Sequence, residues 1–185
     1  ELTITMVVML SKRYSDHVIV IDDGSSDRTR ELAAEAGAEV ISHSVNKGKA
    51  AAMMTGFARA RELDPKVTVM IDADGQMDPS LIPVVSAPVL QGMADLVIGS
   101  RYIGRNDTDT PKHRRVGQKV LNRATTLGAS VDVTDSQSGY RALSSKALNN
   151  TNFNSDHFSI ESEMIAYFSE IGLTITEVPV TVRYD

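Results

Sequence analysis

The run Asp72-Ala73-Asp74-Gly75-Gln76 follows a largely apolar, β-rich stretch at residues 67–71. Carboxylates at the end of a buried parallel strand project into the crevice where α/β sheets bind ligands. Asp72, Asp74 and Gln76 offer oxygen atoms, which hard cations such as Mg²⁺ and Mn²⁺ prefer alongside phosphate oxygens. The run predicts a metal site, or else a polar turn built on Asp74 and Gly75.

A second acidic pair, Asp22 and Asp23, follows another apolar run at residues 18–21. These two carboxylates could accept hydrogen bonds from a base or a ribose. Ser26 or Asp27 instead suits the cap of the helix that comes next. The chain has no Gly-x-Gly-x-x-Gly run, which argues against an ordinary dinucleotide site.

Basic residues offer candidate phosphate contacts. Asn46-Lys47-Gly48-Lys49 precedes a helical pattern. Glycine lets the backbone approach a ligand closely and a helix start favours anions, although the full pattern of a phosphate-binding loop is absent. Arginine suits bidentate phosphate recognition, but a charged surface is usually just solvated. The candidate arginines are Arg101, Arg114, Arg115, Arg141 and Arg183.

Two further polar groups lie in the second half of the chain. Residues 135–143 read as a polar loop that contains Gln137 and Ser138. Glu161 and Glu163 lie near the start of a helix, where they suit the helix dipole or a catalytic role. The four histidines show no metal-ligand spacing and are interpreted as ordinary residues; they are His17, His43, His113 and His157.

Short apolar runs alternate with helical patterns along the chain, and such alternation predicts an α/β sandwich. Strands that are apolar throughout indicate a sheet covered on both faces. The expected strands are residues 18–21, 39–42, 67–71, 96–98 and 174–182, with Pro179 marking an edge or a bulge in the last. The expected helices are residues 1–16, 29–36, 48–61, 81–91, 112–127, 144–149 and 159–170.

The composition of the 185 residues fits one domain, 1–185, of ordinary hydrophobicity. The net charge of −5 gives no global basic signal for nucleic acid. The chain has no cysteine, which removes disulfides and thiolate metal sites and fits an intracellular location. No apolar run approaches the roughly 20 residues that span a bilayer.

In their order and spacing, seven segments resemble family 2 glycosyltransferases, most nearly the dolichyl- and polyprenyl-phosphate sugar synthases. The segments are IDDGSSD, NKGK, DADGQ, GSR, DSQSGYRA, the Glu-rich helix and EVPVTVRY. The resemblance covers nearly the whole chain. It implies the GT-A fold of nucleotide-diphospho-sugar transferases, a Rossmann-like three-layer sandwich with a mostly parallel central sheet.

The same resemblance implies overlapping sets of site residues. The metal ligands would be Asp72, Asp74 and Gln76. The nucleotide-sugar contacts would be Asp22, Asp23, Asn46, Lys49, Asp72, Ala73 and Asp74. The acceptor phosphate would meet Arg101, Arg115 and Arg183. The catalytic group would comprise Asp74, Arg101, Arg115, Asp135 and Gln137, with Ser138 lining the same side.

The implied reaction is metal-dependent, inverting transfer of a sugar to a lipid phosphate, with Mg²⁺ or Mn²⁺ and a UDP- or GDP-linked donor, as in protein glycosylation. Such an enzyme would work at the cytoplasmic face of a membrane. A sugar hydroxyl is the alternative acceptor, and it would need a carboxylate base such as Asp135, Glu161 or Glu163. A sugar nucleotidylyltransferase and a non-catalytic binding module are the remaining alternatives.

One departure concerns the start of the chain. Family members open with a central strand that ends in a Pro-x-x-Asn-Glu loop, and Glu1 matches the last residue of that loop. We therefore expect the natural protein to carry this strand before Glu1, with further nucleotide contacts. The resemblance also leaves room for an extension beyond Asp185.

Overall fold

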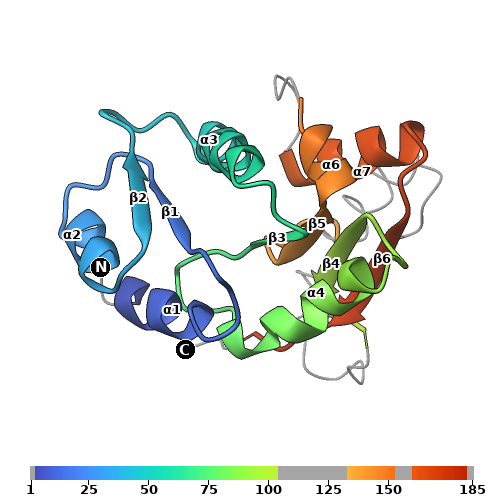
Figure 1. The fold of residues 1–185 in the computed structure, drawn as a ribbon, viewed down its shortest axis with the longest axis horizontal. Coiled ribbons are helices and arrows are strands. Elements are labelled where there is room, and N and C mark those ends of the chain that lie inside the picture. The colour runs from blue at the N-terminus through green and yellow to red at the C-terminus, as the bar shows by residue number, and fades with distance from the viewer. Residues whose placement is uncertain (1–2, 104–132, 153–159, 183–185) are drawn as a thin grey trace, which may run out of the picture.

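The strands of the computed structural model, which describes residues 3–103, 133–152 and 160–182, form two sheets (Figure 1). The first pairs two parallel strands, β1 (Ile19–Asp22) and β2 (Glu39–Ser42). The second has the order β3 (Val67–Met70), β5 (Arg141–Ser144), β4 (Leu96–Ser100) and β6 (Ile175–Pro179).

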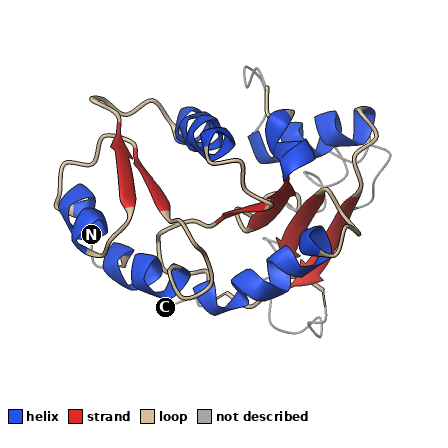
Figure 2. Ribbon diagram, in the orientation of Figure 1, coloured by secondary structure: helices blue, strands red, loops and turns tan. Residues whose placement is uncertain are grey.

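Helices lie on both sides of these strands, which gives three layers (Figure 1, Figure 2). On one side are α1 (Ile4–Ser11) and α4 (Ile82–Leu90), the latter preceded by a 3₁₀ turn at Pro79–Leu81. On the other side are α3 (Lys49–Glu62), α6 (Ser145–Asn149) and α7 (Ile160–Glu170). Helix α2 (Thr29–Glu35) packs beside β2 and α1.

Strand β4 shows why the sandwich is stable. All five of its residues are buried. Leu96 and Ile98 join a core cluster with Phe168 of α7, whereas Val97 joins a second cluster with Val85 of α4. Because successive side chains of a strand point to opposite faces, apolar residues along the whole strand require a helix layer on each face. The predicted α/β sandwich is confirmed.

Strand β5 corrects the prediction of a loop over residues 135–143. Residues 141–144 form a strand that runs antiparallel to both β3 and β4. An arginine at position 141 reads as polar, yet its side chain is fully buried and satisfied by carbonyl groups. Because β5 opposes both neighbours, β3 and β4 run in the same direction. Their carboxyl ends therefore lie at the same edge of the sheet.

Other boundaries differ less. The first helix covers Ile4–Ser11, which is shorter than the expected 1–16. Strand β6 ends at Pro179 and lies at the edge of its sheet, in agreement with the prediction for that proline. The expected helix at 112–127 lies outside the described residues.

Candidate functional site

A lysine and two carboxylates meet beyond the carboxyl end of β3. The ammonium of Lys49, the first residue of α3, lies 3.3 Å from each carboxylate oxygen of Asp72 and 2.8 Å from Oε1 of Glu161. Glu161 comes from the first turn of α7, and its side chain is only 8% exposed. The start of α3, the loop after β3 and the start of α7 thus place the Lys49 ammonium between the carboxylates of Asp72 and Glu161.

The charges of this cluster reinforce one another. Burial alone would lower the pKa of Lys49, but its hydrogen bond to Glu161 and the charge of Asp72 outweigh burial, so the pKa is raised. Burial alone would raise the pKa of Glu161, but the hydrogen bond and charge of Lys49 outweigh it, so the pKa is lowered. Both groups are therefore charged at neutral pH.

The predicted metal ligands lie on the loop after β3. Asp74 and Gln76 are exposed, and Oδ1 of Asp74 accepts the N–H of Gln76 at 2.9 Å. The carbonyl of Ala73 accepts the hydroxyl of Thr3 at 2.7 Å, so the segment that leads into α1 braces this loop.

A hard cation fits these donors. The position beside Asp72 already attracts the Lys49 ammonium, and the loop offers carboxylate and amide oxygens. Over the described ranges, no group of three or more histidine, cysteine, aspartate or glutamate residues converges as a complete metal cage. Such partial sites suit ions whose remaining ligands are water and substrate phosphates, as with Mg²⁺.

Gly139 allows the loop before β5 to lie directly against the Asp72 carboxylate. A Cβ added at this glycine would lie 2.3 Å from Oδ2 and 2.9 Å from Cγ of Asp72. The carboxylate and the loop before β5 can approach this closely only because residue 139 has no side chain.

We expect Gly139→Ala to displace the Asp72 carboxylate and to lower the catalytic rate about 10- to 100-fold, because small misplacements at a reacting centre are costly. The melting temperature should change little, since the clashing atoms belong to the end of a side chain that can rotate. Gly56→Ala on α3 is the matched control, because its Cβ would meet nothing nearer than Ile21 Cγ1 at 3.4 Å. Equal activity of the two variants in a rate assay would contradict this role for Gly139.

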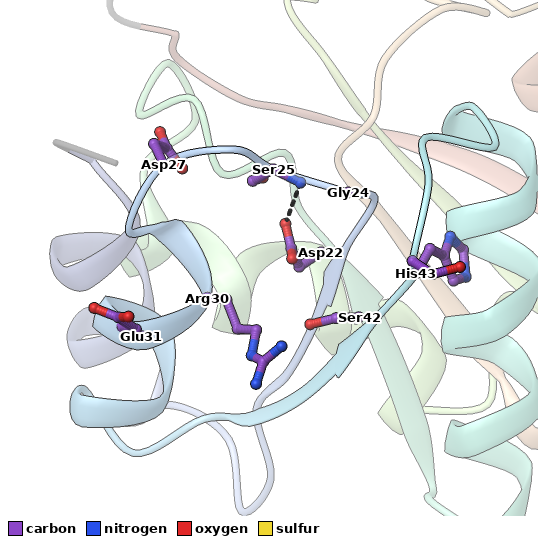
Figure 3. A pocket seen from close by; sticks show the side chains of 9 residues that line it. Asp22, Gly24, Ser25, Asp27, Arg30, Glu31, Ser42 and His43 are labelled. Carbon is purple, nitrogen blue, oxygen red and sulfur yellow. Dashed lines mark hydrogen bonds between the residues drawn. The ribbon is translucent and has the colours of Figure 1, made fainter.

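A cavity of about 460 Å³ opens beside the ends of β1 and β2 (Figure 3). Asp22 is buried in its wall, and its Oδ1 accepts the N–H of Ser25 at 3.1 Å. Arg30 of α2 and His43 also line the cavity, and the His43 ring is turned toward α3. The predicted nucleotide contact Asp22 thus faces a hollow large enough for a small ligand.

Asp23 has a different environment from Asp22. Its Oδ1 accepts from Nδ1 of His43 at 2.6 Å and from the N–H of Lys47 at 2.9 Å, and its Oδ2 accepts from the N–H of Gly48 at 2.7 Å. The bond from His43, followed by the one from Lys47, lowers the pKa of Asp23. Asn46 also caps this turn, since its Oδ1 accepts the N–H of Gly48. Both carboxylate oxygens of Asp23 therefore hold the start of α3.

Arg101 and Asp135, both predicted to belong to the catalytic group, bind each other. Nε of Arg101 lies 2.7 Å from Oδ2 of Asp135, and Nη2 lies 2.8 Å from Oδ1. Glu177 of β6 accepts the N–H groups of Thr134 and Asp135 at 2.8 and 3.0 Å. Sequence reasoning missed Glu177, although it belongs to the EVPVTVRY segment.

The loop before β5 is tied to its neighbours. Nε2 of Gln137 donates to Oγ of Ser162 on α7 at 2.7 Å, and the buried Ser138 donates to the carbonyl of Gly99 at 2.6 Å. Glu163 is half-buried on α7. The remaining arginine predictions, Arg114, Arg115 and Arg183, lie outside the described residues.

Comparisons with known proteins identify relatives of the chain. A family profile described as "Glycosyl transferase family 2" matches residues 3–157. The chain is 38% identical over 178 residues to the protein MJ1222 of Methanocaldococcus jannaschii, which covers 95% of this chain and 73% of that protein. It is 32% identical to the UDP-N-acetylglucosamine–dolichyl-phosphate N-acetylglucosaminyltransferase of Methanococcus voltae, over 91% of this chain and 75% of that protein.

Among solved structures, the chain is similar to glucosyl-3-phosphoglycerate synthase from Mycobacterium tuberculosis, crystallised with Mn²⁺, UDP-glucose and phosphoglyceric acid. The TM-score is 0.73 at 24% identity, and the match covers 99% of this chain and 66% of the other. At that identity the likeness is one of fold, and it supports the GT-A architecture.

Proposed function

Because the chain belongs to glycosyl transferase family 2, whose profile spans most of its length, we propose that it transfers a sugar from a nucleotide-sugar to a dolichyl or polyprenyl phosphate. The displacement is metal-dependent and inverts the anomeric carbon. Dolichyl phosphate is the acceptor named for the Methanococcus voltae relative. The observation that carries the proposal is the Lys49–Asp72–Glu161 cluster at the end of β3, against which the loop at Gly139 lies closely.

The donor would bind between this cluster and the cavity beside Asp22. Asp72, Asp74 and Gln76 would hold Mg²⁺ or Mn²⁺, which supplies Lewis-acid stabilisation to the departing diphosphate when bound. Lys49 stands where its ammonium can donate to the same diphosphate. Asp22 would accept a hydrogen bond from the base or ribose, whereas Asp23 would act by holding the backbone of the lysine-containing loop.

The arrangement of carboxylates favours a phosphate acceptor over a hydroxyl acceptor. A hydroxyl needs a base, whereas a phosphate monoester is already largely dianionic near neutral pH, with a second pKa of about 6. Two candidate bases are each paired with a cation, Asp135 with Arg101 and Glu161 with Lys49. In our proposal Gln137 lines the acceptor side, and Arg101, together with Arg115 and Arg183, orients the phosphate in line with the sugar.

A lipid-linked acceptor would bring the enzyme to the cytoplasmic face of a membrane. Within the described parts of the chain, no helix has the length and hydrophobicity to cross a bilayer. In the proposed arrangement the lipid phosphate reaches the site from the membrane surface.

The test is a transfer assay with radiolabelled UDP- and GDP-sugars, with and without Mn²⁺, in which a short-chain polyprenyl phosphate competes with soluble sugars. We expect label in the lipid phase only when Mn²⁺ and polyprenyl phosphate are both present. Label in a soluble glycan would establish the hydroxyl-acceptor alternative. Pyrophosphate release from a sugar 1-phosphate and a nucleoside triphosphate would instead identify a nucleotidylyltransferase.

A further inference from the structure

His43 joins three elements at the donor side of the molecule. It follows β2, and its side chain is only 7% exposed. Nδ1 bonds to Asp23, directly after β1, and Nε2 lies 2.9 Å from Oγ1 of Thr55, in the second turn of α3. The Thr55 hydroxyl is in turn 3.0 Å from the carbonyl of Ala51. The sequence alone gives His43 no special role, but its buried ring has a polar contact at each nitrogen.

Asp23 links His43 to the backbone that positions Lys49 of the cluster around Asp72. The carboxylate that accepts from His43 also accepts the N–H groups of Lys47 and Gly48. Gly48 has a φ of 89°, a conformation that suits glycine, and it leads directly into Lys49. The position of the Lys49 ammonium therefore depends on how the Asp23 carboxylate is turned.

We propose that His43 is a positioning residue for donor binding, which orients Asp23 and thereby holds the loop that places Lys49. This inference rests on the proposed function, because Lys49 matters here only if it meets a diphosphate. His43 also lines the cavity beside Asp22. His43, at the edge of this cavity, thus also holds through Asp23 the start of the helix that carries the diphosphate contact.

The ring nitrogen that faces Asp23 is the critical one. Without a donor at that point the carboxylate loses its shortest hydrogen bond and can rotate away from the two backbone N–H groups. The Thr55 contact alone anchors the ring to α3 and does not orient Asp23. Loss of the contact with Asp23 should therefore weaken binding of the nucleotide-sugar, whereas loss of the contact with Thr55 should affect it less.

Two substitutions separate these contacts. Asparagine places its amide nitrogen near the position of Nδ1, whereas glutamine reaches toward the position of Nε2. We expect His43→Gln to raise the Kd for UDP or GDP with Mn²⁺, and the KM for the donor, about tenfold, with a smaller change in kcat. His43→Asn should stay within about threefold of the wild type, because it keeps the donor to Asp23.

Calorimetric titration with UDP and with GDP in the presence of Mn²⁺ measures these constants, and thermal unfolding shows whether both variants are folded. Equal weakening in the two variants, or unchanged binding by His43→Gln, would overturn the positioning role. Failure of the wild type to bind either nucleotide would instead overturn the proposed function, and this inference with it.

A measurement on the wild type avoids any folding defect in the variants. With ¹⁵N-labelled histidine, NMR should show Nδ1 of His43 protonated at neutral pH, and its signal should shift on saturation with UDP or GDP and Mg²⁺. An Nδ1 without a proton would contradict the assignment of His43 as the donor to Asp23.

Discussion

Asp74→Asn should lower Mn²⁺-dependent transfer about 1,000-fold while leaving the protein folded, because a charged metal ligand contributes several kcal/mol to stabilising the leaving diphosphate. The substitution is gentle on the fold. Asp74 is exposed, and asparagine keeps the oxygen that accepts the N–H of Gln76. Steady-state rates over a range of Mn²⁺ concentrations, together with the melting temperature, measure both parts of the expectation.

Asp78→Asn is the matched control, because it removes one negative charge four residues away. Oδ1 of Asp78 accepts the N–H of Ser80, and asparagine retains that acceptor as well. The control should transfer sugar at close to the wild-type rate. Full activity of Asp74→Asn at saturating Mn²⁺ would remove Asp74 from the set of ligands.

Arg141→Met should lower the free energy of unfolding by about 3–5 kcal/mol, the usual cost of breaking a buried, fully bonded charge network. The guanidinium is entirely buried and donates to the carbonyls of Ser138, Glu161 and Ser136 at 2.8–2.9 Å. Burial lowers its pKa to about 10, against the opposing effect of Glu161 and other carboxylates, so the group stays protonated at neutral pH. Methionine fills similar space but removes the three hydrogen bonds from the guanidinium to these carbonyls. Urea unfolding at pH 7 gives the free energy.

Arg59→Met provides the comparison on the surface. Arg59 pairs with Glu39 and Glu62 at 2.7 Å each, and its side chain is 30% exposed. Solvent screens exposed ion pairs, so this variant should unfold nearly as the wild type does. If the two variants lost the same free energy of unfolding, the buried hydrogen bonds of Arg141 would not stabilise the fold more than the surface ion pairs of Arg59 do.

Most strands were predictable from their apolar, β-branched residues, and β2 has the expected bounds. Strand β5 was not, because Arg141 at its start reads as exposed until the carbonyls that satisfy it are seen. The pairing of Arg101 with Asp135 was equally hidden. Both residues were chosen as candidates, but 34 positions separate them and only the fold brings them together.

His43 shows a related limit of sequence reasoning. A lone histidine without metal-ligand spacing carries no signal of its own, and its importance comes from the elements that meet at its ring. The acidic run at the end of β3 could be recognised from the sequence, because carboxylates that follow an apolar strand are expected at the ligand-binding edge of the sheet. Within the described ranges, candidates from the ends of β1, β3 and β4 lie at the carboxyl edges of their sheets, as a ligand-binding α/β fold requires.

Glu177 has a consequence for the order in which the enzyme is made. Ribosomes extend a chain from its amino end at about 5–20 residues per second, and Asp135 emerges 42 residues before the carboxylate that grips its N–H group. Until β6 has been synthesised and has docked against β4, Glu177 cannot accept the N–H groups of Thr134 and Asp135. Asp135 is the residue that orients Arg101. A nascent or prematurely terminated chain that stops short of residue 177 would thus lack the carboxylate that holds the Arg101–Asp135 pair in place. It would lack this support even though every acidic residue of the loop after β3 had already been synthesised.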